Sequence, residues 1–213
     1  MGNFDTCIVS VAFREPYETH SVRQECFIET SKAETEYEAL IGILPTKSGL
    51  KMGDIIPEFQ KSLYGFKPHA IQRAINKGYT KVIWFDPSVL PITNVQVLID
   101  SLDKHPLIVV KGDNPLSKMT NKKAKDWFGV TDKDIEGINH IGGTIYCFNF
   151  NNLKVLECFN LWKKAEEEGI FGNQDEFMAG HWADESCMAL AMFKTGIEQY
   201  SEPSFKYLNQ KEL

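Results

Sequence analysis

The sequence predicts an α/β fold, a single domain with a central, mostly parallel mixed sheet flanked by helices. Apolar, β-branched runs typical of buried strands alternate along the chain with amphipathic segments. The chain has 213 residues, 43% of them hydrophobic, which is enough for one large domain with a sizeable core. No internal repeat or linker-like stretch divides residues 1–213, so we expect one domain.

The opening of the chain predicts a β-α-β unit, the building unit of a parallel sheet. The expected elements are a strand at Thr6–Phe13, a helix at Glu18–Ala33, a strand at Glu38–Leu44 and a short helix at Ile55–Tyr64. In the first helix we place Val22, Cys26 and Phe27 on the side that faces the core.

The segment from Pro68 to Asp86 predicts a helix, a turn, a buried strand and then a carboxylate. Pro68–Lys77 has its small and apolar residues on one helical face, and Lys81–Phe85 (KVIWF) is rich in β-branched and aromatic residues. Pro87 cannot donate a hydrogen bond to a strand ladder, so pairing should stop at Asp86. Asp86 then lies at the carboxyl end of a central strand, where open α/β sheets bind their ligands.

The remainder of the chain continues the alternation of strands and helices. We expect a helix at Ile92–Leu102, a strand at Leu107–Val110, an irregular lysine-rich surface segment at Leu116–Asp134, a strand at Thr144–Phe150, a helix at Asn152–Glu168, a loop at Gly169–Gly180, a last helix from His181 to Gly196 and a terminal strand at Ile197–Tyr200.

Charge and cysteine content exclude several classes of protein. The net charge is −6, the sequence pI is about 5.4, and no cluster of Lys and Arg dominates, which argues against a nucleic-acid partner. No apolar run approaches the roughly 20 residues that span a bilayer, so we expect no membrane span. The five cysteines form no CxxC pair, which favours reduced thiols and a cytoplasmic location.

Three segments that follow predicted strands carry groups suited to ligand binding. These are Phe13–Tyr17, with an aromatic ring and an Arg that can hold a base or a phosphate, Asp86–Ser88, and His140–Gly143, whose glycines let a ligand approach the backbone. The chain lacks G-x-G-x-x-G after its first strand and G-x-x-x-x-G-K-[ST] throughout. It is therefore not typical of a dinucleotide-binding Rossmann enzyme or a P-loop ATPase.

The order of three segments resembles the GT-A fold glycosyltransferases. KPHAIQRAINKGYTKVIWFDPSVLP resembles the helix, strand and acidic motif of that family, where the strand ends in Asp-x-Asp. IGGTIYCFNFNNLKVL resembles the glycine-led strand that borders the donor sugar, and HWADESCMALA resembles its acidic helix start. The likeness runs from Thr6 to about Gly196, and within the family it is similar to the N-terminal module of chlorella-virus members. That likeness implies a viral protein of the host cytoplasm, and leaves open a longer natural chain.

The resemblance implies a UDP-sugar donor, a glycan or glycoprotein acceptor, and Mn²⁺ or Mg²⁺. The donor's leaving group is a diphosphate whose negative charge grows as the glycosidic bond breaks, and a divalent ion neutralises that charge as a Lewis acid. Oxygen ligands suit both ions. Glucose-like and rhamnose-like donors both remain open.

The expected site residues follow from this resemblance and from the chemistry of the side chains. Asp86 is the expected metal ligand, with Ser88 second. Asp184 and Glu185 are the expected catalytic carboxylates, and Asp175 is their rival. The expected nucleotide-sugar contacts are Val11, Ala12, Phe13, Arg14, Tyr17, Arg73, Asp86, Lys111, Gly142 and Gly143.

Several of these residues also have an ordinary structural interpretation. Lys67 and Arg73 are both candidates for solvated helix charges, and Asp184 and Glu185 could simply complement a helix dipole. His140 and His181 are interpreted as structural histidines rather than ligands. Trp182 is either a platform for an acceptor sugar or a core residue.

The sequence departs from the family at the acidic motif, which reads Asp86-Pro87-Ser88 and has one carboxylate. No His follows His181, although many relatives have one near the C-terminus. Two alternatives therefore stay open. One is a non-catalytic carbohydrate-binding module on a decayed transferase fold. The other is a sugar nucleotidyltransferase, against which FREPYETH stands in place of a glycine- and lysine-rich signature.

Overall fold

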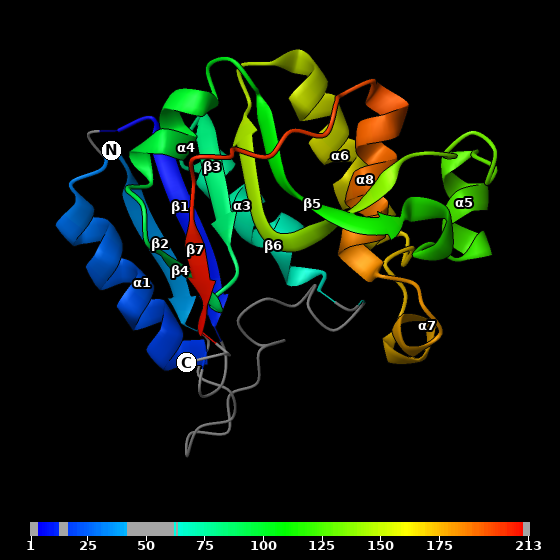
Figure 1. The fold of residues 1–213 in the computed structure, drawn as a ribbon, viewed down its shortest axis with the longest axis horizontal. Coiled ribbons are helices and arrows are strands. Elements are labelled where there is room, and N and C mark those ends of the chain that lie inside the picture. The colour runs from blue at the N-terminus through cyan, green and yellow to red at the C-terminus, as the bar shows by residue number, and fades with distance from the viewer. Residues whose placement is uncertain (1–3, 13–16, 42–61, 63, 211–213) are drawn as a thin grey trace.

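The computed structural model describes residues 4–12, 17–41, 62 and 64–210, and shows a mixed sheet between two layers of helices (Figure 1). The elements in chain order are β1 (Thr6–Ala12), α1 (Tyr17–Ser31), β2 (Glu36–Ile41), α3 (Phe66–Asn76), β3 (Lys81–Phe85), β4 (Val89–Pro91), α4 (Gln96–Ser101), β5 (Leu107–Pro115), the 3₁₀ turn η2 (Leu116–Lys118), α5 (Lys122–Phe128), β6 (Asn139–Asn149), α6 (Leu153–Glu167), α7 (Gln174–Met178), α8 (Ala183–Thr195) and β7 (Tyr207–Asn209).

The central sheet has five strands in the order β2-β1-β3-β6-β5. β1 pairs in parallel with β2 and β3, which confirms the predicted β-α-β opening. β6 runs antiparallel to both β3 and β5, so four of the five strands share one direction. The predicted mixed, mostly parallel sheet is confirmed, and β3 has the bounds that the sequence predicts.

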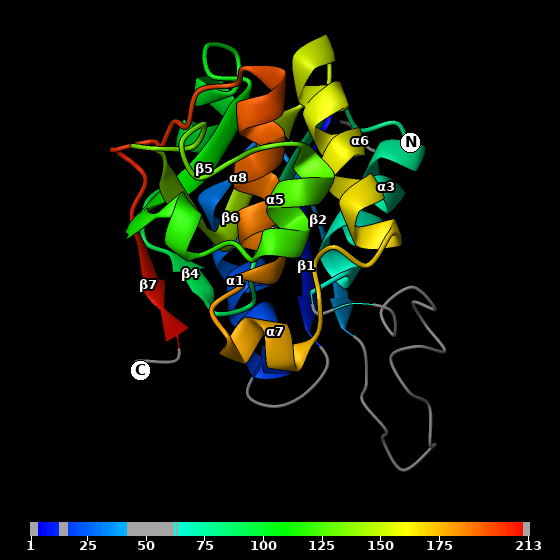
Figure 2. The same cartoon turned by 90° about the vertical axis from the view of Figure 1, so that its right-hand side faces the viewer.

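Alternating side chains on the strands build a core on each face of the sheet. One face packs against α3, α5, α6 and α8, the group of helices nearest the viewer in Figure 2. The other face packs against α4, part of α1 and the segment around Phe205. Trp84 and Tyr146 lie in the first core, and their neighbours Ile83 and Ile145 lie in the second.

α1 turns a polar face toward the sheet, which corrects the predicted orientation of this helix. Val22 and Cys26 are exposed, and Phe27 is only half-buried. The buried residues of the helix are His20, Ser21, Gln24 and Ile28. This face is held by hydrogen bonds, because the Gln24 amide donates to the carbonyl oxygens of Asp86 and Val89, and buried polar groups need such partners.

The lysine-rich segment at Leu116–Asp134 is more ordered than predicted. It contains η2 and α5, and α5 begins at the Asn121 cap and ends at Gly129 in the left-handed conformation. Ala124 and Phe128 are buried in the core against the side of α8. Local capping and a few apolar anchors therefore outweigh the high lysine content here.

Two further predictions of secondary structure, the terminal strand and the loop at Gly169–Gly180, need correction. No strand forms at Ile197–Tyr200, although the Tyr200 carbonyl accepts a hydrogen bond from the Val109 amide. The terminal strand is β7, which pairs with β4 in a separate two-stranded sheet that the sequence did not predict. The predicted loop at Gly169–Gly180 contains the short helix α7.

One further helix differs from its predicted bounds. α4 is shorter than the predicted Ile92–Leu102, because Ile92 lies beside the β4 edge and is exposed. The predicted helix at Ile55–Tyr64 lies almost entirely outside the described residues. Among the helices that are described, none combines the length and the apolar character that crossing a membrane requires.

Candidate functional site

A cleft of about 150 Å³ lies where β3 ends, and five elements and the segments beside them line it. Its lining residues are Tyr64, Lys67, Asp86, Ser88, Gly143, Thr144, Phe177, Trp182, Asp184, Glu185 and Asn209. The structure therefore brings together the predicted Asp86, Ser88 and Gly143 with the predicted carboxylates of α8. Pockets that enclose whole drug-sized ligands usually measure about 300–1,000 Å³, so the described part of the cleft suits a fragment such as one sugar ring.

Asp86 is fixed at the rim by its own turn. Its backbone amide donates to the Thr144 carbonyl at 2.8 Å, and its Oδ1 accepts a hydrogen bond from the Ser88 amide at 2.8 Å. Among the described residues, no other group donates a hydrogen bond to this carboxylate. The turn thus holds one carboxylate oxygen in place and leaves the other for a ligand.

β6 shifts its pairing next to the cleft. Val109 of β5 pairs with Tyr146, but the following Val110 pairs with Gly142, so residues 143–145 of β6 bulge away from β5. Such bulges are frequent next to functional sites because they redirect the chain. Here the bulge carries Gly143 and Thr144 to the cleft.

Gly143 leaves room for the side chains of Lys67 and Glu185 to pack against it. Its amide donates to Glu185 Oε1 at 2.6 Å, and its carbonyl accepts from Lys67 Nζ at 3.0 Å and Trp84 Nε1 at 3.2 Å. A Cβ at this position would lie 2.6 Å from Lys67 Nζ and 2.8 Å from Glu185 Oε1. The glycine leaves room for protein side chains here, and its backbone groups are engaged by the protein rather than directed at a ligand.

Lys67 is buried in the first turn of α3, which contradicts its interpretation as a solvated helix charge. Its Nζ lies 2.6 Å from Asp184 Oδ2, and its side chain is 4% exposed. The ammonium group also lies 4.9 Å from the ring centroid of Tyr64 and 5.6 Å from that of Tyr146. Aromatic faces and a carboxylate together compensate for the loss of water around this cation.

Burial and neighbouring charges shift the pKa values of Lys67, Asp184 and Tyr146. Burial lowers the pKa of Lys67, but the carboxylates of Asp184, Glu185 and Asp86 outweigh that effect, and the pKa is raised above its usual value. Burial raises the pKa of Asp184 to about 6, against the opposing influence of Lys67. Burial likewise raises the pKa of Tyr146 well above its usual value, so its hydroxyl stays protonated and donates to Asp184 Oδ2 at 3.1 Å.

The start of α8 holds the two predicted catalytic carboxylates in fixed positions. Ala183 has a φ of +38°, an unfavourable conformation for a residue with a side chain. The Asp184 carbonyl accepts from Trp162 Nε1 at 2.9 Å, and the Asp184 side chain is 1% exposed. Glu185 turns its carboxylate toward β6, where it meets Gly143 and His140. Backbone strain at this position is held by the packing around it, as is common at functional sites.

Aromatic side chains form one wall of the cleft. Phe177 of α7 contacts Trp182 at a centroid distance of 5.6 Å and Tyr64 at 6.3 Å. Trp182 is 36% exposed, so it is not a core residue. An exposed aromatic face beside polar groups is suited to a sugar ring, whose apolar face packs on it while its hydroxyls reach the polar groups.

Several predicted contact residues lie outside this cleft. Val11 and Ala12 are buried at the end of β1. Arg73 is exposed near the end of α3, six residues beyond Lys67, and Lys111 is exposed on β5 beside a different hollow. Gly142 packs against Val110. Tyr17 begins α1 and is half-buried, whereas Phe13 and Arg14 lie outside the described residues.

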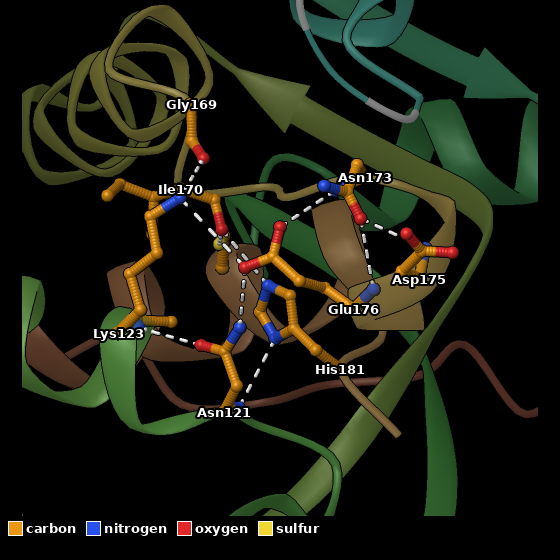
Figure 3. Close-up of polar contacts among 10 residues, drawn as sticks. Asn121, Lys123, Gly169, Ile170, Asn173, Asp175, Glu176 and His181 are labelled. Carbon is orange, nitrogen blue, oxygen red and sulfur yellow. Dashed lines mark hydrogen bonds and ion pairs between the residues drawn. The ribbon is translucent and has the colours of Figure 1, made fainter. Parts of the chain in front are cut away.

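Asp175, the rival catalytic acid, is an exposed residue in the first turn of α7 and does not line the cleft. Figure 3 shows that this turn is organised by Asn173 and Glu176, which form a reciprocal cap. His181 lies beside them, donating from Nε2 to the Ile170 carbonyl and accepting at Nδ1 from the Asn121 amide. Burial lowers the pKa of His181, and both ring nitrogens are engaged by the backbone, so this histidine is structural.

The described residues of the cleft supply only a small number of ligands for a divalent ion. Among the described residues, no group of three or more His, Cys, Asp and Glu is placed to hold a metal. Three carboxylates line the cleft against the single ammonium of Lys67, so the described charges there are negative in sum. A diphosphate would be repelled unless a cation accompanied it. Asp86, with one carboxylate oxygen free of described partners, suits an ion that is held mainly by phosphate oxygens, as Mg²⁺ often is.

Sequence reasoning missed Lys67, Tyr64, Tyr146 and Phe177 as parts of the site. For Lys67 a signal was present, because Lys67, Ala70, Ile71 and Ala74 share one helical face at the spacing of a buried stripe. A lysine on such a stripe requires a buried partner. No comparable local signal distinguishes Tyr146 from the other aromatic residues of its strand.

The central five-stranded mixed sheet with its flanking helices matches the GT-A fold of solved glycosyltransferase structures. Solved structures with this fold include an active-site mutant of LgtC, which is 16% identical with a TM-score of 0.51, over 91% of this chain and 72% of the other. Mouse xyloside xylosyltransferase 1 in its apo form is 9% identical with a TM-score of 0.52, over 92% of this chain and 84% of the other.

The apo structure of the bifunctional glycosyltransferase WbbM is 12% identical with a TM-score of 0.51, over 94% of this chain and 39% of that longer protein. No family model matches the sequence. No curated protein matches it either. At these identities the likeness concerns the fold, and it confirms the predicted GT-A architecture.

Proposed function

We propose that the protein is a glycosyltransferase that moves a sugar from a UDP-sugar to a glycan or glycoprotein acceptor. The observation that carries this proposal is the convergence of Asp86, Ser88, Asp184 and Glu185 on one cleft of a GT-A fold. These residues come from segments up to about a hundred positions apart in the sequence. Their meeting at the end of β3 matches the place where open α/β sheets bind ligands.

In this proposal Lys67 and Asp184 act on the donor sugar. An ammonium group has three N–H donors, and Lys67 uses two of them on Asp184 and the Gly143 carbonyl, which leaves one for a ligand oxygen. The fixed negative charge of Asp184 stabilises the positive charge that develops on the sugar carbon as its bond to the diphosphate breaks. A carboxyl with a pKa near 6 also suits acceptance of the acceptor's hydroxyl proton close to neutral pH.

A divalent ion, Mn²⁺ or Mg²⁺, would be held by Asp86, with Ser88 beside it, together with the donor's phosphate oxygens. When bound, such an ion supplies Lewis-acid stabilisation of the departing diphosphate. Trp182 would pack against a sugar ring of the acceptor. We also propose a glucose- or rhamnose-like donor, a single domain over residues 1–213, a viral origin and a cytoplasmic location.

Release of UDP from UDP-glucose and UDP-rhamnose, with Mn²⁺ and a saccharide acceptor, tests this proposal. We expect release above the protein-free rate, and a loss of at least about 100-fold in Asp184→Asn, because the charge at the reaction centre is removed. Asp126→Asn is the matched control, since Asp126 is exposed on α5 and, within the described part of the chain, its carboxylate pairs with Lys122. Wild-type protein that releases no UDP from any nucleotide sugar would refute the proposal.

A second candidate is a non-catalytic carbohydrate-binding module on the same fold. It is favoured by the single carboxylate in Asp86-Pro87-Ser88 and by the limited metal donor set among the described residues. Saccharide binding by the wild type, together with an absence of UDP release, would favour this function over transfer.

A further inference from the structure

We infer that His140 is a positioning residue that holds Glu185, and through it the Gly143 amide, at the rim of the cleft. Glu185 places one carboxylate oxygen on each of two groups of β6. Its Oε1 accepts from the Gly143 amide at 2.6 Å, and its Oε2 lies 2.9 Å from His140 Nε2. The Glu185 carboxylate of α8 is thus held by two residues of β6, His140 and Gly143, which lie three positions apart in the sequence.

The contact between His140 and Glu185 requires a proton on the imidazole. Glu185 Oε2 and His140 Nε2 are both buried, and neither has a well-aligned hydrogen-bond partner among the described residues. An imidazole lone pair facing a carboxylate oxygen at this distance would be repelled, so Nε2 carries the hydrogen. The two buried atoms lie within ion-pair distance, and the electrostatic attraction across this contact offsets part of the cost of burying them.

The surroundings of His140 fix its ring in this position. The ring meets Trp182 edge-on, at a centroid distance of 5.3 Å and an interplanar angle of 71°. Gly112 of β5 also lies beside the ring, since a Cβ there would come within 3.1 Å of His140 Nδ1. His140 is 5% exposed and does not line the cleft, so it acts through its neighbours rather than on a ligand.

The inference deepens the proposed function and rests on it for its kinetic consequence. Glu185 follows Asp184 directly, and both lie in the first turn of α8 beside the strained Ala183. Holding Glu185 on β6 fixes this turn against the sheet. Asp184 keeps its own bonds to Lys67 and Tyr146, so loss of the clamp should impair turnover more than donor binding.

The test compares two substitutions that separate shape from hydrogen bonding. His140→Phe keeps a ring against Trp182 but cannot donate, whereas His140→Gln keeps a donor that reaches Glu185. We expect His140→Phe to lower kcat for UDP release about tenfold with donor KM changed less than about twofold, and His140→Gln to retain most of the wild-type kcat. His140→Leu serves as the apolar variant if the Phe protein does not fold.

A readout independent of catalysis is the amide proton of Gly143 in a protein labelled with ¹⁵N-glycine. A short bond to a carboxylate moves an amide proton downfield, and we expect this shift to persist in His140→Gln and to be lost in His140→Phe. An unchanged Gly143 resonance in His140→Phe would overturn the inference, as would a moved resonance with wild-type kcat. A wild-type protein without UDP release refutes the proposed function instead, and the amide readout still decides whether His140 positions Glu185.

Discussion

Lys67 Nζ and Asp184 Oδ2 lie 2.6 Å apart, and both side chains are almost completely buried. The two residues are 117 positions apart in the sequence and join the first turn of α3 to the first turn of α8. Both residues line the cleft, where Lys67 lies over the Tyr64 ring and donates to the Gly143 carbonyl in the bulge of β6. The cleft is therefore assembled around an internal ion pair, whose removal should be felt in stability as well as in function.

Lys67→Met should destabilise the protein by about 3 kcal/mol, because Asp184 then stays buried without a counter-charge. Adding Asp184→Asn to that variant should restore a large part of the loss, since no unpaired charge remains. Urea unfolding at neutral pH measures both effects. Equal stabilities for the single and double variants would contradict the role given to the pair.

The unfolding free energy should depend on pH through Asp184. Burial raises its pKa to about 6, whereas the unfolded carboxyl titrates near about 3.9. Between these values the native state binds a proton that the unfolded chain does not, so this group's contribution to stability increases as the pH falls from about 6 to about 4 and is smallest above 6.

Down to pH 4.5 the size of that effect is about 2 kcal/mol, because about 1.5 pH units separate this pH from the native pKa of about 6, at about 1.36 kcal/mol each. It is measured as the wild-type unfolding free energy minus that of Asp184→Asn, across pH 4.5 to 7.5. This difference should grow toward acid. If this difference in unfolding free energy stays constant or decreases toward acid pH, the Asp184 carboxyl of the native state does not take up a proton in this range.

Gly143→Ala should cost about 1–3 kcal/mol and lower activity, because the added methyl group would displace Lys67 Nζ and Glu185 Oε1 together. Gly142→Ala is the matched control, since a Cβ there meets its nearest neighbour, Val110, at an ordinary 3.6 Å. Its cost should stay below about 1 kcal/mol. Thermal unfolding of the two variants separates these outcomes, and equal melting temperatures would argue against the close packing around Gly143.

Asp86→Asn should weaken UDP binding in the presence of Mn²⁺ at least about tenfold, because the side chain keeps its turn to Ser88 but loses its charge. Asp175→Asn makes the same chemical change on the exposed side of α7 and should bind as the wild type does. Calorimetric titration with UDP and Mn²⁺ checks both. Undiminished binding in Asp86→Asn would remove Asp86 from the metal site.

The features predicted well from sequence are those encoded over a few neighbouring residues. The strand Lys81–Phe85 shows its β-branched and aromatic run directly, and Gly196 ends α8 in the left-handed conformation expected of a helix-terminating glycine. Asp86 follows a strand and Asp184 opens a helix, so both were placed at element ends by local pattern.

The features predicted poorly depend on partners far away in the chain. The buried face of α1 is polar because Gln24 bonds to Asp86 and Val89, about sixty residues on, and an apolar pattern could not reveal this. β4 is a short strand only because β7 lies beside it. Asp175 and Asp184 each looked like a catalytic acid in sequence, and only the packing of α8 against β6 brought one of them into the cleft.

The sequence alone therefore determined the main strands and helices, the sheet class and the carboxylates at its rim, because propensity and periodicity act over short distances. The tertiary structure decided which of those groups meet. Lys67 became a buried partner of Asp184, and Glu185 a clamp on β6, through contacts between segments that local pattern leaves independent. Burial then raised the pKa of Asp184, and the nearby carboxylates raised the pKa of Lys67, because electrostatic effects depend on how far water is excluded from the charged groups.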